Sequence, residues 1–112
     1  MGQTNPPFMS GVPELLVLRL LSRNTMYGYE LVRTIRATTS DAISLAEGVV
    51  YPVLYGLERR GALKAKRKTV NGRSRVYYSI TAKGNRRLDE LTEEWQRVTN
   101  GIRTALEEPG RA

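Results

Sequence analysis

The chain contains no cysteine and no histidine. These absences exclude disulfides, thiolate zinc sites and haem ligation through imidazole, and they remove every mechanism that uses histidine as its base. Among the remaining residues, Tyr27, Glu30 and Tyr77 are the only weak catalytic candidates, and they form neither a triad nor a metal-ligand set. We therefore expect a protein that is not an enzyme and that has no metal site and no cofactor.

Long apolar runs are also missing. The longest, residues 15–21, is interrupted by Arg19 and is far too short to cross a bilayer. Residues 1–10 lack the basic and apolar regions of a secretory signal, so we expect a cytoplasmic protein without membrane contact. A chain of 112 residues, of which 40% are hydrophobic, is long enough for one domain with one modest core.

Acidic residues are absent from one long internal segment. None occurs between Glu58 and Asp89, whereas this interval holds 11 of the 18 basic residues of a chain whose net charge is +7. Six of the 11 acidic residues lie at Asp89 and beyond. Because a solvated surface normally mixes both signs of charge, a block of one sign indicates a polyanionic partner. The alternative at this point is a surface that serves only solubility.

Two helices are expected in the first third of the chain. Residues 1–12 are rich in proline and glycine and are interpreted as an N-terminal arm. Pro13 suits the first turn of a helix. The following residues 15–21 are apolar almost all round that helix, so it must be covered on several sides, and a second subunit is the natural candidate. A second helix is predicted over residues 27–37 from its apolar spacing.

A third helix is predicted after a polar break. Ser44 and Glu47 have the spacing of a capping box, and Gly61 marks the end of the helix. Pro52 and Gly56 lie inside it, and each disfavours a helix, so tertiary packing must override both. The residues expected in the core are Val49, Val53, Leu54 and Leu57.

A hairpin follows, with extended runs at residues 63–69 and 75–80. Between them lies Asn71-Gly72, a strong signal for a tight hairpin turn because both residues accept positive φ. Alternation in the second run allows one face of the hairpin to be buried.

A long helix is predicted over residues 82–107, with Thr81 as its N-cap. Its apolar residues have heptad spacing and are Leu88, Leu91, Trp95, Val98, Ile102 and Ala105. The helix would be about 37 Å long, which is longer than so small a core can cover, so we expect it to pair with a second copy. The alternative is a helix that lies along its own domain. Residues 108–112 are expected to be a frayed tail.

Three helices followed by a basic hairpin is the element order of a winged helix-turn-helix. The predicted fold class is mainly α with a small β-hairpin wing (α+β). Residues 13–81 would form a DNA-binding domain, and residues 82–107 a C-terminal dimerisation helix. A helix of this kind fills the major groove of DNA. The outer face of the third helix would present Gly48, Tyr51, Pro52, Tyr55 and Arg59.

The hairpin supplies the positive charge expected at a DNA surface. Its basic candidates for DNA contact are Lys64, Lys66, Lys68, Arg73 and Arg75. Lysine also protects edge strands from aggregation, but that role needs only one or two charges.

Four motifs resemble the PadR family of transcription regulators. They read YGYEL at residues 27–31, EGVVYPVL at 47–54, LERRGAL at 57–63 and YYSITAKG at 77–84. The resemblance covers roughly residues 13–98, and the short C-terminus is similar to the compact subfamily with a single C-terminal helix. It implies a homodimer that binds a palindromic operator, usually as a repressor, with the C-terminal helix against the first helix of the partner.

The resemblance also implies roles for particular residues. It places Tyr51-Pro52 in the recognition helix, and Arg73 and Arg75 in the wing. Relatives commonly carry basic residues where this chain has Tyr55 and Gly56, so contacts made there by relatives are not carried over.

Trp95, the only tryptophan, lies on the predicted dimer stripe. It can simply fill the interface. Compact relatives bind planar compounds between their subunits, and the resemblance therefore implies a site for a planar hydrophobic or cationic effector beside Trp95. The residues expected at this effector site and dimer interface are Leu15, Leu18, Leu91, Trp95, Val98 and Ile102. Glu94 and Asp89 would attract a cationic compound.

A different reading is a winged-helix module that binds a protein. In this hypothesis the basic wing docks on an acidic protein surface, without sequence-specific DNA binding. Tyr55 and Gly56, which stand where basic contacts are expected, favour it.

Overall fold

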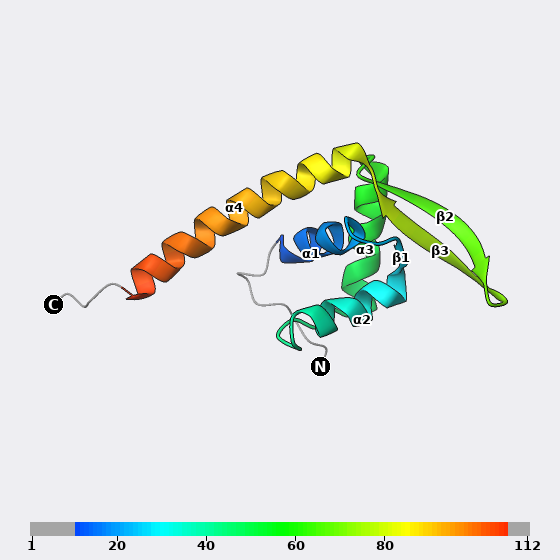
Figure 1. The fold of residues 1–112 in the computed structure, drawn as a ribbon, viewed down its shortest axis with the longest axis horizontal. Helices are drawn as coiled ribbons and strands as arrows, with labels where there is room; N and C mark the ends of the chain where they lie inside the picture. Colours follow the sequence, from blue (N-terminus) through cyan, green and yellow to red (C-terminus); the bar gives the residue numbers. More distant parts are fainter. Residues whose placement is uncertain (1–10, 108–112) are drawn as a thin grey trace.

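The computed structural model describes residues 11–107 of the chain. Residues 1–10 of the predicted arm (residues 1–12) and the predicted tail lie outside these residues. Val12, which was assigned to the arm, is the first residue of α1. The elements in order are α1 (Val12–Leu21), β1 (Met26–Tyr27), α2 (Gly28–Thr38), α3 (Glu47–Arg59), β2 (Leu63–Val70), β3 (Arg73–Ile80) and α4 (Ala82–Glu107), as Figure 1 shows. The predicted fold class is confirmed: three helices and a hairpin wing precede one long helix.

The core lies where the first three helices meet the base of the hairpin. α1 packs against α2, α3 and α4, so its apolar character is explained largely by contacts within its own chain. Leu18 on α1, Leu31 on α2 and Leu54 on α3 are fully buried. Among the leucines of α1, Leu15 and Leu16 are only partly buried.

The sheet has three antiparallel strands in the order β1-β3-β2. β1 pairs with β3 through Met26 opposite Tyr78, and a strand of two residues is too short to carry a recognisable sequence pattern. Asn71 and Gly72 have φ values of 53° and 77°. These positive values are those of the predicted two-residue hairpin turn.

The predicted capping box of the third helix is wrong. α3 begins at Glu47, and its N-cap residue is Ala46, which makes no side-chain hydrogen bond to the helix. Ser44 lies two residues before the N-cap position and is therefore not the capping residue. The contact expected of a capping-box carboxylate occurs instead at the start of α2, where the N–H of the N-cap residue Tyr27 donates to Glu30 Oε1 at 3.4 Å. Val50 is the fully buried valine of α3, while Val49 and Val53, predicted for the core, are partly buried.

The end of α3 follows the prediction. Gly61 has φ +81°, its N–H donates to the Glu58 carbonyl, and the Ala62 N–H donates to the Leu57 carbonyl at 2.9 Å. This pair of bonds is a Schellman motif. It turns the chain directly into β2 and sets the angle between α3 and the hairpin.

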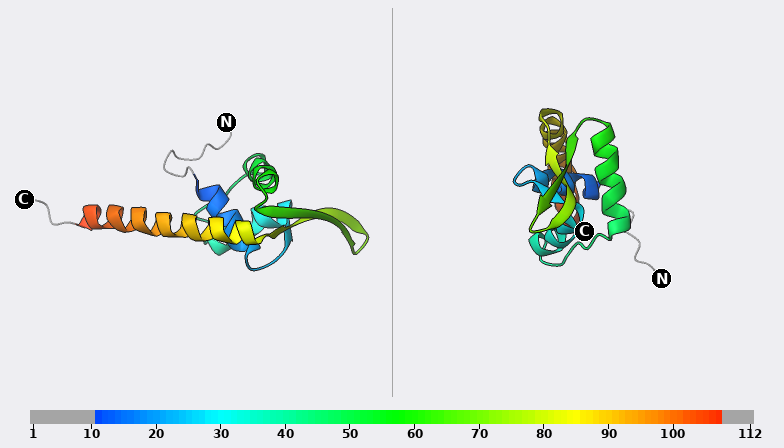
Figure 2. Two further views of the ribbon diagram at one scale, coloured as in Figure 1. Left: turned by 90° about the horizontal axis from the view of Figure 1, so that it is seen from above. Right: turned by 90° about the vertical axis from the view of Figure 1, so that its right-hand side faces the viewer.

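α4 begins at a tightly packed junction. The Gly84 N–H donates to Thr81 Oγ1 at 3.1 Å, as predicted for a capping threonine, and the Thr81 hydroxyl donates to the Gly61 carbonyl at 2.7 Å. A side chain at Gly84 would overlap the Ala62 carbonyl and lie 2.6 Å from Ile80 Cγ1. From this junction α4 runs past α1 and away from the rest of the molecule (Figures 1 and 2). Within residues 11–107, no helix combines the length and the hydropathy needed to span a membrane.

Candidate nucleic-acid surface and apolar groove

Five of the six basic residues of the hairpin lie on one face, and Arg67, which pairs with Val76, lies on the other. The register pairs Lys64 with Ser79, Lys66 with Tyr77, Lys68 with Arg75 and Val70 with Arg73. Directly paired residues share a face, and alternate residues along a strand share it too. All five basic residues predicted for DNA contact therefore point to the same side, away from the face through which Tyr78 enters the core.

Aromatic rings connect this basic face to the start of α2. Lys68 Nζ lies 4.6 Å from the centroid of the Tyr77 ring. Tyr77 in turn packs edge-to-face on Tyr27, with centroids 5.5 Å apart, and Arg75 Cζ lies 4.2 Å above the Tyr27 ring. Cation–π contacts of this kind fix long basic side chains in place. The cations and rings thus form one ordered row across the sheet.

α2 extends this row with a residue that the sequence did not single out. Arg33 Nη2 donates to the Tyr27 hydroxyl at 3.2 Å, and Arg33 Cζ lies 5.2 Å from the Tyr29 ring. Tyr29 and Arg33 have the i, i+4 spacing of residues that share one helix face. This spacing is the sequence signal that could have identified Arg33. The positive surface therefore includes α2 as well as the hairpin.

A pocket lies between α2, α3 and β3. Its volume is about 330 Å³, and it is lined by Tyr27, Gly28, Tyr29, Tyr51, Tyr55, Arg75, Val76 and Tyr78. We call it the tyrosine pocket. A Cβ atom at Gly28 would stand 2.5 Å from the Tyr51 ring, so this glycine allows α2 and α3 to meet closely. Tyr51 and Tyr55 are 6.1 Å apart between centroids.

Two tyrosine phenols of this pocket have raised pKa values. Burial is the main cause of the raised pKa of Tyr51, and the charges of Glu47 and Tyr55 add to it. Burial also raises the pKa of Tyr78, with Tyr55, Glu58 and Tyr51 as further causes. Both hydroxyls therefore stay neutral at physiological pH and can donate hydrogen bonds.

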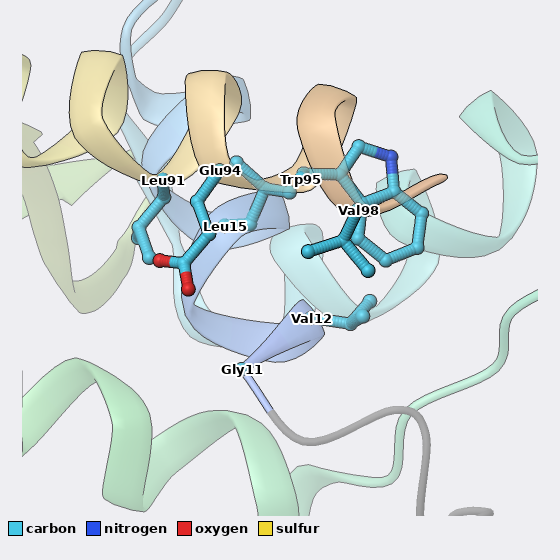
Figure 3. A pocket seen from close by; sticks show the side chains of 7 residues that line it. All are labelled: Gly11, Val12, Leu15, Leu91, Glu94, Trp95 and Val98. Carbon is cyan, nitrogen blue, oxygen red and sulfur yellow. The ribbon is translucent and has the colours of Figure 1, made fainter. Parts of the chain in front are cut away.

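An apolar groove separates α1 from α4 (Figure 3). Its volume is about 300 Å³, and it is lined by Gly11, Val12, Leu15, Leu91, Glu94, Trp95 and Val98. The Trp95 side chain is 43% exposed although it is large and apolar. Glu94 supplies one negative charge at a site whose other side chains are apolar. Within the described residues, no group of three or more acidic side chains could hold a metal ion.

Comparison with known proteins identifies the family. The profile of the Transcriptional regulator PadR-like family matches residues 17–90. The chain belongs to this family. The PadR-like fold is also the fold of a PadR-like transcriptional regulator from Bacillus cereus, with a TM-score of 0.80 and 28% identity over 93% of this chain and all of that one. A transcriptional regulator from Clostridium thermocellum gives a TM-score of 0.81 and 27% identity, over 88% of this chain and 97% of that one.

Two curated relatives are similar in sequence to this PadR-like chain. An uncharacterized protein from Lysinibacillus sphaericus is 33% identical, over 82% of this chain and 85% of that protein. The transcriptional regulator YqjI from Escherichia coli is 28% identical over 91% of this chain. The chain spans about half the length of YqjI, 48%.

The PadR-like structure brings together most, but not all, of the predicted site residues. On α3, Tyr55 is 47% exposed, and Gly48 and Pro52 are exposed on the same helix. Nothing lies within 4 Å of a Cβ built at Gly48, so no packing contact requires glycine there. Arg59 lines a different pocket, at the C-terminal end of α3, and is separate from the tyrosine pocket.

The predicted effector residues need one correction. Leu15, Leu91, Trp95 and Val98 line the groove, but Leu18 has no exposed surface. Its side chain points into the core of its own domain, so its placement at an interface or effector wall is wrong. Ile102 is 53% exposed and lies beyond the groove, farther along α4. Gly11 and Val12 were missed, because the sequence did not show that α4 passes over the first turn of α1.

Proposed function

We propose that this PadR-like regulator is a cytoplasmic repressor that binds a palindromic operator as a homodimer. The observation that carries the proposal is the single basic face of the hairpin, joined by Tyr27 and Tyr77 to the tyrosine pocket beside α3. α3 is suited to the major groove and the hairpin tip to the adjacent minor groove. The DNA strand that separates the two grooves then crosses between α3 and the hairpin.

The tyrosine pocket lies at this crossing point. Phenol hydroxyls and guanidinium groups are common donors to backbone phosphates, which position a protein without reading sequence. Tyr51, Tyr55 and Arg75 line the pocket, and Arg33 stands beside it on Tyr27. These groups therefore hold the backbone, while the outer face of α3 approaches the bases.

The exposed stripe on α4 supports the homodimer. Trp95, Val98 and Ile102 of the heptad stripe and Leu106, one turn after Ile102, are between 40% and 80% exposed. An apolar stripe with heptad spacing is typical of a helix that packs on another helix. A second copy would bury this stripe together with the half-exposed Leu15 and Leu16 of α1. The apolar groove would then lie at the subunit interface.

The groove supports release of the operator by a small effector. Its volume of about 300 Å³ is at the lower end of the range for ligand sites. Trp95 offers a flat ring for stacking, and Glu94 offers a charge for a cation. The class of effector is therefore a planar hydrophobic compound, which can be cationic.

Operator binding is tested by titrating DNA from the region upstream of the protein's own gene. We expect affinity in the nanomolar range, a steep fall with added salt because counterions are released, and much weaker binding to a random duplex of the same length. Equal affinity for both duplexes would contradict sequence-specific regulation.

Effector binding is tested through Trp95 fluorescence. Saturating amounts of a planar cationic dye should quench the emission, because the ring would stack on the dye. An unchanged emission spectrum at saturation would reject the effector site.

A second candidate function is a module that binds an acidic protein surface. Tyr55 and Gly56 on α3 favour it, because neither residue supplies a cation at the recognition helix. Arg73→Ala combined with Arg75→Ala separates the two functions. Loss of repression of a reporter, together with loss of operator binding, would reject the protein-binding module.

A further inference from the structure

A second basic hollow lies at the C-terminal end of α3, where α1, α3 and α4 meet. Its volume is about 520 Å³, and it is lined by Glu14, Leu57, Arg59, Arg60, Ala62, Lys83 and Arg87. We call it the junction hollow. None of its residues belongs to the hairpin, and none lines the tyrosine pocket. Arg59 was expected on the helix face presented to DNA, but it lines this hollow instead and not the tyrosine pocket. The hollow is therefore distinct from the hairpin face and the tyrosine pocket proposed for DNA.

An anionic oxygen is already bound in the junction hollow. Glu14 Oε2 accepts a hydrogen bond from Arg87 Nε at 3.0 Å, and the same oxygen lies 3.5 Å from Arg60 Nη2. The Glu14 side chain is 18% exposed, so it reaches in from α1 towards both guanidinium groups. Arg87 Nη1 also lies 3.6 Å from Glu90 Oε1. The two arginines, from α3 and α4, are thus spaced to hold one anionic oxygen between them.

The junction hollow has positive charge in excess. It is lined by four cations and one carboxylate, and in the described part of the chain no carboxylate lies within 4.0 Å of Arg59 or Lys83. The first turn of α4 contains no acidic residue, although the positive end of a helix dipole favours acids and disfavours cations such as Lys83. A second anionic group would therefore be bound favourably beside the first.

We propose that the junction hollow binds a small molecule carrying at least two phosphate groups. One phosphate takes the position of the Glu14 carboxylate between Arg60 and Arg87, since guanidinium groups bind phosphate and carboxylate oxygens in the same way. The next phosphate lies between Arg59 and Lys83. The hollow is concave and lined by four cations, which suits a compact polyanion. The projecting face of the hairpin suits the convex backbone of a duplex.

The test uses calorimetric titration of the full-length protein with inorganic tripolyphosphate, at constant ionic strength and without DNA. Arg59→Ala with Lys83→Ala removes two cations that form no ion pair within residues 11–107, and we expect about tenfold weaker binding, the order of one lost charged hydrogen bond. Lys64→Ala with Lys66→Ala removes the same charge from the hairpin and should leave the affinity unchanged. Equal weakening in both variants, or wild-type affinity no higher than for sulfate, would overturn the proposal.

Glu14→Gln provides a test whose expected result, stronger binding, could not be produced by a loss of folding. Removing the competing carboxylate should strengthen tripolyphosphate binding severalfold, and weaker or unchanged binding would count against the site. Operator affinity of the Arg59→Ala, Lys83→Ala variant completes the experiment. If it falls as far as that of the hairpin variant, the hollow is part of the DNA surface and the proposal fails. The calorimetric outcome does not depend on whether the protein recognises an operator.

Discussion

At the scale of single residues, Gly28 links the two helices on which the DNA proposal depends. A methyl group at this position would stand 2.5 Å from the Tyr51 ring, so Gly28→Ala must displace Tyr51 or separate α2 from α3. We expect a loss of about 1–3 kcal/mol in the free energy of unfolding, which is typical of overpacking, together with weaker operator binding.

Gly48→Ala is the matched control, because open space surrounds a Cβ at Gly48. Alanine there should stabilise α3 by up to about 1 kcal/mol through helix propensity. Urea unfolding of both variants measures the difference. Equal stability of Gly28→Ala and wild type would show that Tyr51 and α2 are not in tight contact.

Tyr51 should make stability depend on alkaline pH. Burial, Glu47 and Tyr55 raise the pKa of its phenol above the ordinary value of 10.0. A group whose pKa is higher in the folded chain contributes full stability below the unfolded pKa, and this contribution is lost as the pH rises through the folded pKa. The free energy of unfolding should therefore fall above about pH 10. Tyr51→Phe should fall less steeply in urea unfolding at the same pH values, and an identical slope would contradict this.

Individual residues also mark where sequence reasoning stopped. Lys64, Lys66 and Lys68 alternate along one strand and therefore share a face, but Arg33 joins them only because β1 brings Tyr27 beside Tyr77. Tyr27 and Tyr77 are 50 residues apart in the chain, so no local sequence pattern predicts their contact. Ser44 failed as a cap for a similar reason: the helix start is decided by which residues pack, and Leu45 is buried in the core before α3 begins.

At the scale of elements, the hairpin is the part that the sequence predicted best. Asn71-Gly72 defined the turn, and two-residue turns also define the register of the strands. The register then puts five of the six basic residues of the hairpin on one face. α4 and its cap at Thr81 were equally predictable, whereas the angle between α4 and α1, and hence the groove, depends on tertiary packing at Gly84.

The hairpin should determine the salt dependence of DNA binding. Lys64→Ala with Lys66→Ala removes two cations that would meet phosphates, so the slope of log affinity against log salt should decrease in magnitude by about two. Arg59→Ala with Lys83→Ala removes equal charge from the junction hollow and should retain the wild-type slope. Fluorescence titration of the operator at four salt concentrations measures both, and equal slopes for the two variants would contradict the assignment.

At the scale of the whole molecule, α4 is an arm whose apolar stripe is buried at Leu88 but largely exposed from Trp95 onward among the described residues. Ile102 is 53% exposed and Leu106 is 80% exposed. Ile102→Glu with Leu106→Glu should leave the monomer folded, because neither side chain belongs to its core, and should halve the mass measured by light scattering. The affinity for the operator should also fall, since each half-site would then be bound by a separate monomer.

Asn100→Glu is the control for this prediction. Asn100 is exposed on the face of α4 opposite the stripe, so the variant should keep the mass of the wild type. A mass that does not change in the Ile102→Glu, Leu106→Glu variant would show that copies of the chain do not pair through this stripe.

The central claim is that two copies present α3 and the basic hairpin face to one duplex. Hydroxyl-radical footprinting of the protein on its upstream DNA tests this most directly, because it reports protection of each backbone position. We predict two symmetric sets of protected sugars, related by the dyad of the site and centred about 34 Å or a multiple of it apart. A single unsymmetric protected segment, or uniform weak protection along the duplex, would contradict the account.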